Sequence, residues 1–125
     1  MSDYKHTIAF RIKPFESFNR LLRTLNVFEE YNKIKNYEWC DTDREALLEL
    51  NYEVLNDKNL RIIYYKDELY VDILYKNDWV DGDFSFYMST DDVKEIVDKT
   101  GIQYVGVITI IAHSWYDGCD EPYTY

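Results

Sequence analysis

Residues 60–75 read LRIIYYKDELYVDILY, in which two runs of aliphatic and aromatic side chains flank the polar triplet Lys66-Asp67-Glu68. β-Branched and aromatic residues favour strands, and a short polar interruption between two such runs is typical of a hairpin turn. In the second run, apolar side chains recur at every other position, which is the period of a strand with one buried face. The stretch therefore predicts an antiparallel hairpin.

The segment before this hairpin, residues 41–55, contains two conflicting patterns. Thr42 followed three residues later by Glu45 is the pattern of a capping box at the start of a helix. From position 48 to 54, apolar and polar residues alternate strictly, which favours a strand. We expect a short helical turn followed by a strand, because a turn at 56–59 would join that strand to the hairpin. A further turn at Asp81-Gly82 predicts another short strand over 84–88.

The two ends of the chain supply the remaining elements. Residues 6–13 alternate in polarity and predict a half-buried strand that Pro14 ends, and apolar spacing over about 16–31 predicts one amphipathic helix. Ser89 is a suitable N-cap for a second helix, which Gly101 closes as its C′ residue. Residues 103–112 are apolar on both faces, which predicts a central strand covered on each side.

The predicted fold is α+β. It is a two-layer sandwich with an antiparallel or mixed sheet of about five strands and two helices, in the order β-α-β-β-β-(β)-α-β. The chain of 125 residues fits one domain spanning 1–125. Residues 113–125 are expected to form either a terminal hairpin strand or a flexible tail.

Charge is divided unevenly along the chain. Residues 1–37 carry seven Lys/Arg against four Asp/Glu, a balance of +3, whereas residues 38–125 carry seven against twenty, a balance of −13. The stretch 67–98 contains ten of these acids against Lys76 and Lys94. Such a field repels nucleic acid and anionic membranes and attracts basic proteins. The alternative is that the acids only form a solvated surface.

Aromatic residues are interleaved with the acids of this stretch. Because successive strand side chains point to opposite faces, we place Tyr64 and Tyr70 away from the face that holds Ile63, Val71 and Ile73. Exposed Tyr and Trp ringed by acids are characteristic of protein interfaces. The predicted partner-binding residues combine carboxylates on turns and a helix N-terminus with three aromatic anchors: Asp67, Glu68, Asp72, Asp78, Asp81, Asp83, Asp91, Asp92, Glu95, Tyr70, Trp79 and Tyr87.

Two other constellations could carry chemistry. Asp78, Asp81 and Asp83 around a glycine form an oxygen-rich loop that could hold a divalent cation, although Asp-Gly is also a common hairpin turn. His113 and Cys119 resemble a thiol beside a base, but a lone Cys and a lone His are more often inert. We therefore predict no metal and no cofactor.

The compartment follows from cysteine usage and from the N-terminus. The two cysteines are far apart, and no basic region followed by an apolar run marks a secretory signal, so a reducing cytosol is expected. A bias toward Ile, Asn, Lys, Asp and Tyr is typical of AT-rich coding DNA and is consistent with a bacterium or its phage. No apolar run approaches the roughly 20 residues of a membrane helix.

These observations predict a binding protein without enzymatic activity. The favoured hypothesis is an acidic inhibitor that occupies the basic, nucleic-acid-binding surface of a partner protein, of the anti-defence or DNA-mimic type. In composition alone, the chain resembles phage-encoded anti-defence proteins that imitate DNA. Alternatives are an immunity protein that neutralises a basic toxin, a small metal-dependent enzyme, and a domain that pairs with a second copy as a homodimer.

Overall fold

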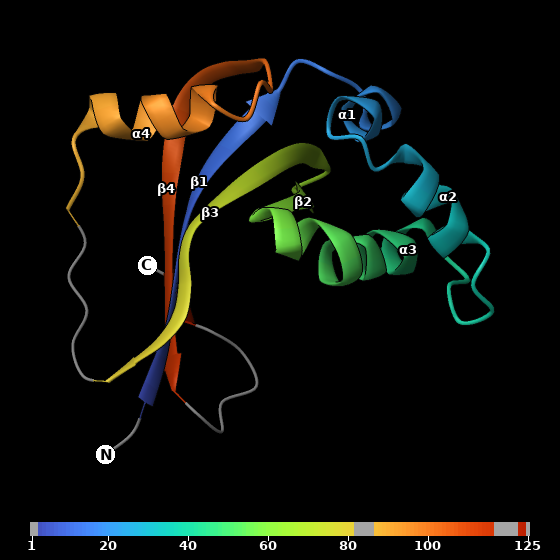
Figure 1. Ribbon diagram of the computed structural model, residues 1–125, viewed down its shortest axis with the longest axis horizontal. Coiled ribbons are helices and arrows are strands. Elements are labelled where there is room, and N and C mark those ends of the chain that lie inside the picture. Colours follow the sequence, from blue (N-terminus) through green and yellow to red (C-terminus); the bar gives the residue numbers. More distant parts are fainter. Residues whose placement is uncertain (1–2, 82–86, 117–122, 125) are drawn as a thin grey trace.

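The computed structural model describes the backbone of residues 3–81, 87–116 and 123–124, and the side chains of residues 5–78 and 87–112. The elements, shown in Figure 1, are β1 (Asp3–Pro14), α1 (Phe18–Thr24), α2 (Phe28–Lys35), α3 (Asp43–Leu50), η1 (Asn51–Leu55), η2 (Asn56–Lys58), β2 (Leu60–Tyr65), β3 (Glu68–Asp81), α4 (Thr90–Asp98), β4 (Tyr104–Tyr116) and β5 (Tyr123–Thr124). The η1 segment is a π-helical turn and η2 a 3₁₀ turn, so the chain stays helical from α3 to the start of β2.

The strands form one open antiparallel sheet in the order β2-β3-β1-β4-β5. Strand β5 contributes only two residues to it. The α+β class, the antiparallel sheet and the two-layer arrangement predicted from the sequence are confirmed. The described residues form four α-helices, however, where the sequence predicted two.

All four α-helices pack on one face of this sheet. Val93 and Val97 of α4 belong to the same buried cluster as Phe10 of β1 and Leu21 of α1. In Figure 1, α4 lies at the β4 side of the sheet and α1–α3 lie at the β2 side. The core therefore extends along the whole helical face, and the opposite face of the sheet carries no helix within the described part of the chain.

The predicted helix over 16–31 is two helices. Asn26 has a φ of 60°, in the left-handed region, and its backbone N–H donates to the carbonyl of Arg23. Asn tolerates this conformation better than most residues, and it ends α1 there. Val27 is buried next to it and begins the second helix, so the apolar spacing continues although the helix does not.

The predicted strand over 48–54 is wrong. Thr42 is the N-cap, as its pairing with Glu45 predicted: the Glu45 backbone N–H donates to Thr42 Oγ1 at 3.1 Å, and the helix that starts here continues into η1. Leu47 and Leu50 are buried, whereas Leu48 and Tyr52 are 59% and 79% exposed. The alternation that favoured a strand came from apolar residues on the solvent side of a helix.

The central strand is β1 and not the predicted 103–112. Thr7 and Ala9, on the face without helices, are buried together with Ile8 and Phe10 on the other face, as expected for the middle strand of the sheet. In β4, by contrast, Val107 is 85% exposed, because β4 bulges away from β1 near Gly106, whose φ is 78°.

The N-cap predicted for the second helix is confirmed, whereas its C-cap is Lys99, so Gly101 lies one residue beyond the C′ position that the sequence predicted for it. Ser89 caps α4 by accepting from the Asp92 backbone N–H at 3.2 Å. Gly101 follows the helix with a φ of 76°, a left-handed conformation that glycine adopts without strain. No described helix combines the length and the apolar run that crossing a membrane requires.

The predictions on either side of α4 have mixed outcomes. Of the predicted strand 84–88, Tyr87 and Met88 lie outside regular structure, and the rest is outside the described residues. At the C-terminus, β5 pairs with Ser114 and His113 of β4, which agrees with a terminal hairpin strand for these two residues.

Candidate functional site

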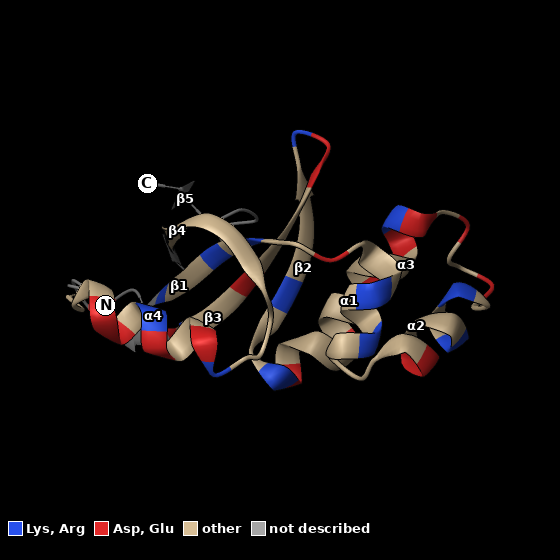
Figure 2. Cartoon of the chain, turned by 90° about the horizontal axis from the view of Figure 1, so that it is seen from above, with Lys and Arg blue, Asp and Glu red and all other residues tan. Residues whose placement is uncertain are grey.

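The predicted acidic stretch is not one surface. Asp72 is fully buried on the sheet face opposite to the helices, so the prediction that it contacts a partner is wrong. Its carboxylate accepts from Arg11 Nε and Nη2 at 2.7 and 2.9 Å, and from Arg61 Nε and Nη2 at 3.2 and 2.9 Å. Figure 2 shows this arrangement as an acidic band on β3 between basic bands on β1 and β2. Two guanidinium groups compensate the cost of burying this charge.

Glu68 and Tyr70 also belong to a polar network, which lies at the surface of the sheet. Glu68 accepts from Lys13 Nζ at 2.9 Å and from the Tyr70 hydroxyl at 2.9 Å. These two hydrogen bonds, first that from Lys13 and then that from Tyr70, lower the pKa of Glu68. The Arg11 guanidinium lies 5.8 Å from the Tyr70 ring and 5.7 Å from the Tyr65 ring. Two of the predicted contact residues are therefore already engaged within the chain.

The remaining predicted residues of β2–β3 lie at the two ends of the hairpin. Asp67 is exposed at the tip, where its φ of 65° forms the tight turn. Asp78 is exposed and lies opposite His6 in the ladder of β1 and β3. Trp79 and Asp81 belong to β3 by their backbone, but their side chains and the whole of Asp83 are outside the described residues. Of the three acids in the predicted cation loop, only Asp78 therefore has a described side chain.

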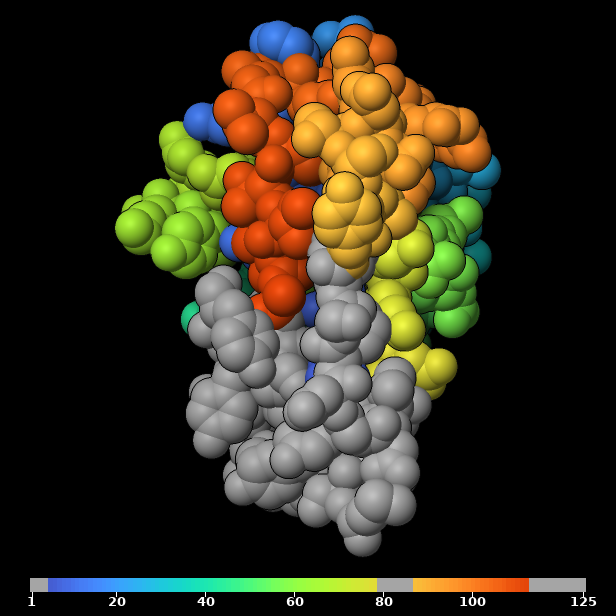
Figure 3. Space-filling model, turned by 90° about the vertical axis from the view of Figure 1, so that its left-hand side faces the viewer, coloured from blue at the N-terminus to red at the C-terminus, as the bar shows by residue number. Residues whose placement is uncertain are grey.

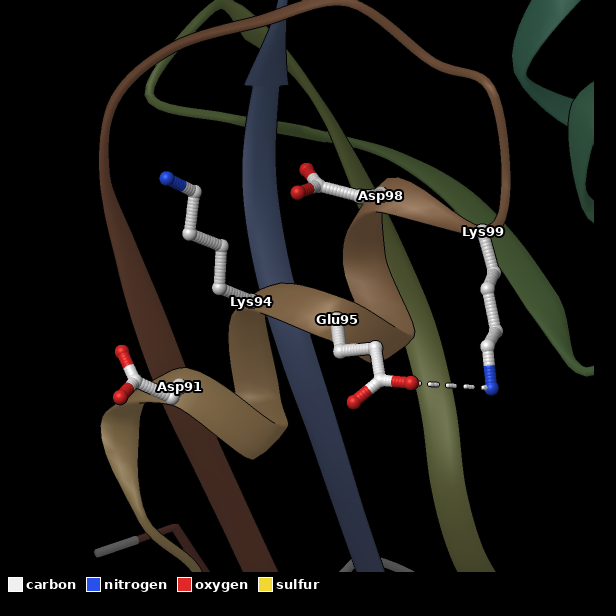
Figure 4. Close-up of a pocket in the computed structure, with 5 residues that line it drawn as sticks. All are labelled: Asp91, Lys94, Glu95, Asp98 and Lys99. Atoms are coloured by element: carbon white, nitrogen blue, oxygen red, sulfur yellow. Dashed lines mark ion pairs between the residues drawn. The ribbon is translucent and has the colours of Figure 1, made fainter.

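The α4 carboxylates, Asp91, Asp92, Glu95 and Asp98, are exposed on the outer side of that helix. A hollow of about 490 Å³ is lined by α4 and the residue after it, and Glu95 pairs there with Lys99 at 3.6 Å. In Figure 4, Asp91 points away from this pair. Figure 3 shows α4 beside β4 on this side of the molecule. Tyr87, just before α4, is 95% exposed. Without a second wall, the hollow is a charged surface and not an enclosed site.

The predicted pair of His113 and Cys119 lies outside the described residues, because neither Cys119 nor the side chain of His113 is described. Cys40 is a free thiol in the core. Burial raises its pKa, and the nearby carboxylates of Glu49, Glu45, Glu53 and Asp41 raise it further. A thiol held protonated in this way is a poor nucleophile. No set of three or more metal-ligating side chains gathers in the part of the chain that the structure describes.

A groove with several walls lies between the β2 edge of the sheet and the helices. We call it the β2 groove, and its volume is about 790 Å³. It is lined by residues of α1, α2, α3, η1, β2 and the hairpin tip, namely by Phe18, Tyr31, Asp43, Arg44, Leu47, Leu48, Asn51, Ile62, Ile63, Tyr64, Lys66 and Asp67. This volume lies within the range of about 300–1,000 Å³ that is usual for ligand pockets.

The β2 groove has an aromatic and aliphatic floor with charges at its rim. The Phe18 ring lies 5.1 Å edge-on from Tyr31 and 6.4 Å from Tyr64. Burial raises the pKa of Tyr31, with smaller contributions from Asp43 and Tyr64, so the three groups lie close together. Tyr64 remains 54% exposed. The groove therefore offers a partly open aromatic surface with a carboxylate beside it.

Helix α3, one wall of this groove, is strongly acidic. We call Asp41, Asp43, Glu45, Glu49 and Glu53 the α3 carboxylates, and Arg44 is the one cationic residue between positions 41 and 57. They are absent from the predicted contact residues because half of this segment was assigned to a strand. The capping box at Thr42, followed by acids at positions 45, 49 and 53, is the signal of a helix with one charged face.

Asn51 closes part of the sheet edge beside the groove. Its Nδ2 donates to the Ile62 carbonyl at 2.8 Å, and its Oδ1 accepts from the Ile62 backbone N–H at 2.9 Å. The carboxamide thus pairs with edge strand β2 as a neighbouring strand would. Blocking an edge strand in this way protects the sheet from pairing with other chains.

Comparison of the chain with protein family models, with curated protein sequences and with solved structures finds no match.

Proposed function

We propose that this chain is a cytosolic binding protein without enzymatic activity, which occupies a basic surface of a partner protein. The contact is centred on helix α3 and the β2 groove. The observation that carries the proposal is an apolar groove floor beside a helical segment that carries Asp41, Glu45, Glu49 and Glu53 at exposed or half-exposed positions outside the groove lining. Hot spots of protein interfaces combine buried aromatic anchors with charges of complementary sign.

The partner class follows from the charge. The chain has a formal net charge of −10, and carboxylates outnumber cations on the exposed sides of both α3 and α4, so the field outside these helices is negative. A negative field accelerates association with basic proteins. A host protein that binds nucleic acid has such a basic surface, and with this partner the chain would act as an anti-defence inhibitor. A cognate basic toxin presents the same chemistry and makes it an immunity protein.

The α4 carboxylates are given a secondary role. They lie at the β4 end of the helical face, whereas α3 lies at the β2 end (Figure 1), and the hollow beside them is lined by charged residues without an apolar floor. Charges at the rim of an interface mainly change the association rate and its salt dependence. Neutralising α4 should therefore slow capture of the partner, whereas neutralising α3 should abolish it.

The test is affinity capture from bacterial lysate at low and high salt with three proteins. These are the wild type, an α3 variant (Asp41→Asn, Asp43→Asn, Glu49→Gln and Glu53→Gln) and a matched α4 variant (Asp91→Asn, Asp92→Asn, Glu95→Gln and Asp98→Asn). Each variant removes four charges from exposed or half-exposed positions. Retention of a basic protein by the wild type and the α4 variant, and its loss from the α3 variant and in high salt, supports the proposal. Equal capture by all three proteins contradicts it.

A further inference from the structure

The edge of β2 carries one backbone position that is open beside the β2 groove. Lys66 and Asp67 form a two-residue turn with φ values of 51° and 65°, so Tyr65 and Glu68 are the hydrogen-bonded pair that closes the hairpin. Hydrogen-bonded and non-hydrogen-bonded pairs then alternate along an antiparallel ladder. The backbone N–H and C=O of Ile62 and of Tyr64 consequently point away from β3, toward the open edge.

Asn51 confirms this alternation at Ile62. It binds both outward groups of Ile62 at 2.8 and 2.9 Å, and no described residue does the same for Tyr64, two residues further along. Tyr64 lines the β2 groove together with Leu47 and Leu48 of α3. At Ile62 the edge of β2 thus binds an amide group, which resembles a peptide bond. The equivalent backbone groups of Tyr64 are open to bind another one.

We propose that an extended segment of a basic partner protein adds to the sheet at Tyr64 and places an apolar side chain in the β2 groove. This inference rests on the proposed function and specifies its mode of contact. Adding a strand to an exposed edge gives affinity through main-chain hydrogen bonds and specificity through pockets for alternate side chains. The floor formed by Phe18, Tyr31 and Leu47 is the pocket for such a side chain.

The charge that favours a basic occupant comes from the surroundings of the groove, namely Asp41, Glu45, Glu49 and Glu53, because Asp43 and Asp67 in the lining itself are balanced by Arg44 and Lys66. Asp43 on α3 and Asp67 at the hairpin tip are exposed and belong to no ion pair within the described residues. Of the two groove cations, Lys66 lies 5.3 Å from the Tyr65 ring. Because successive side chains of an added strand point to opposite faces, the lysine or arginine residues next to the apolar anchor would point away from the groove, and the net charge of −10 attracts them at long range.

The test uses a short synthetic peptide on the intact ¹⁵N-labelled chain. The probe is a capped heptapeptide of alternating Lys and Val, compared with the same peptide N-methylated at its central Val and with an alternating Glu and Val peptide. We expect the Lys-Val peptide to shift the Tyr64 amide and the amides that line the groove. N-Methylation, which removes a backbone donor, should weaken binding about tenfold. The Glu-Val peptide should bind at least as weakly.

Two substitutions at exposed apolar positions of the same helical segment give a matched pair. Leu48→Asn removes a groove wall and should weaken binding of the Lys-Val peptide about fivefold, the equivalent of losing part of one leucine contact. Tyr52→Asn lies outside the groove lining and should leave binding unchanged. Both side chains are more than half exposed, so neither variant should unfold the chain.

The other outcomes overturn this inference without deciding the proposed function. Shifts confined to α4 or to the outer side of α3, unaffected by N-methylation, would show basic-peptide binding by charge alone. Equal binding of the Glu-Val peptide would refute a basic occupant. Absence of binding by any peptide would refute docking at Tyr64, and the capture experiment would still test whether a basic partner exists.

Discussion

Asp72 and Arg11 face each other across β3 and β1 and form a two-pronged ion pair, with distances of 2.7 and 2.9 Å between the guanidinium nitrogens and the carboxylate oxygens. The carboxylate has no exposed surface, and Arg61 occupies its remaining side. This acid of the acidic stretch therefore holds three strands together and is not available to a partner.

Replacing Asp72 should destabilise the fold strongly. Asp72→Asn leaves two guanidinium groups on one sheet face without their counter-charge, and breaking a buried pair from one side costs about 3 kcal/mol. Urea unfolding followed by circular dichroism measures this cost. Asp67→Asn, at the exposed hairpin tip, is the matched control and should change the free energy of unfolding by less than about 0.5 kcal/mol. Equal stability of the two variants would contradict a structural role for Asp72.

The pairing of Asp72 with Arg61 could have been predicted from the sequence. A two-residue turn at Lys66-Asp67 pairs Tyr65 with Glu68, and counting back along the ladder brings Arg61 opposite Asp72. The predicted turn had three residues and included Glu68. A shift of one residue moves side chains to the other face of a strand.

The error in the length of the turn changes the sheet faces on which Tyr64 and Tyr70 are expected to lie. We expected Tyr64 and Tyr70 to lie away from one face that holds Ile63, Val71 and Ile73. Tyr70 instead shares the face of its partner Ile63, and Tyr64 shares the face of Val71 and Ile73, so the expectation is wrong in part for each tyrosine. Tyr64 lies instead on the helical side, near Phe18, where it borders the β2 groove.

Other parts of the site depend on contacts between distant segments and could not be predicted from a local pattern. The order β2-β3-β1-β4 is needed to bring Arg11 beside Asp72, and nothing in residues 6–13 specifies the neighbouring strand. The β2 groove likewise requires α3 to lie along the edge of β2. That placement depends on η1, whose wider turn directs Asn51 to Ile62, and such turns are rare insertions that local apolar spacing does not indicate.

The stability that the network of Lys13, Glu68 and Tyr70 contributes should be lost at both low and high pH. The pKa of Glu68 is lowered from 4.5, so its contribution to stability is present above pH 4.5 and is lost as the pH falls through the folded-state pKa. The pKa of Tyr70 is raised from 10.0, mainly by its hydrogen bond to Glu68, so that contribution is present below pH 10.0 and is lost at higher pH. Carboxyl chemical shifts measured by NMR should give Glu68 a pKa below 4.5, and Lys13→Gln should raise it. Lys33→Gln on α2 should not change it.

Cys40 should react slowly. Burial and four neighbouring carboxylates raise its pKa, so little thiolate is present near neutral pH. In a Cys119→Ser background, alkylation by iodoacetamide followed by mass spectrometry should be at least about tenfold slower in the folded chain than in urea. Glu49→Gln should accelerate the folded-state reaction, and Glu30→Gln on α2 should not. Fast alkylation of the folded chain would show that the thiol is accessible and reactive.

Asn51 should protect the chain from pairing with itself. Its side chain satisfies the outward N–H and C=O of Ile62, so Asn51→Ala should lower the free energy of unfolding by about 1–2 kcal/mol. The same change lengthens the open edge from Tyr64 to include Ile62, and exposed edges promote strand pairing between chains. Light scattering after size-exclusion chromatography should therefore show more self-association as the concentration rises. Asn36→Ala, which removes a single exposed hydrogen bond to the Asn32 carbonyl, is the matched control. If both variants lose similar stability and remain in the wild-type oligomeric state, Asn51 does not guard the edge.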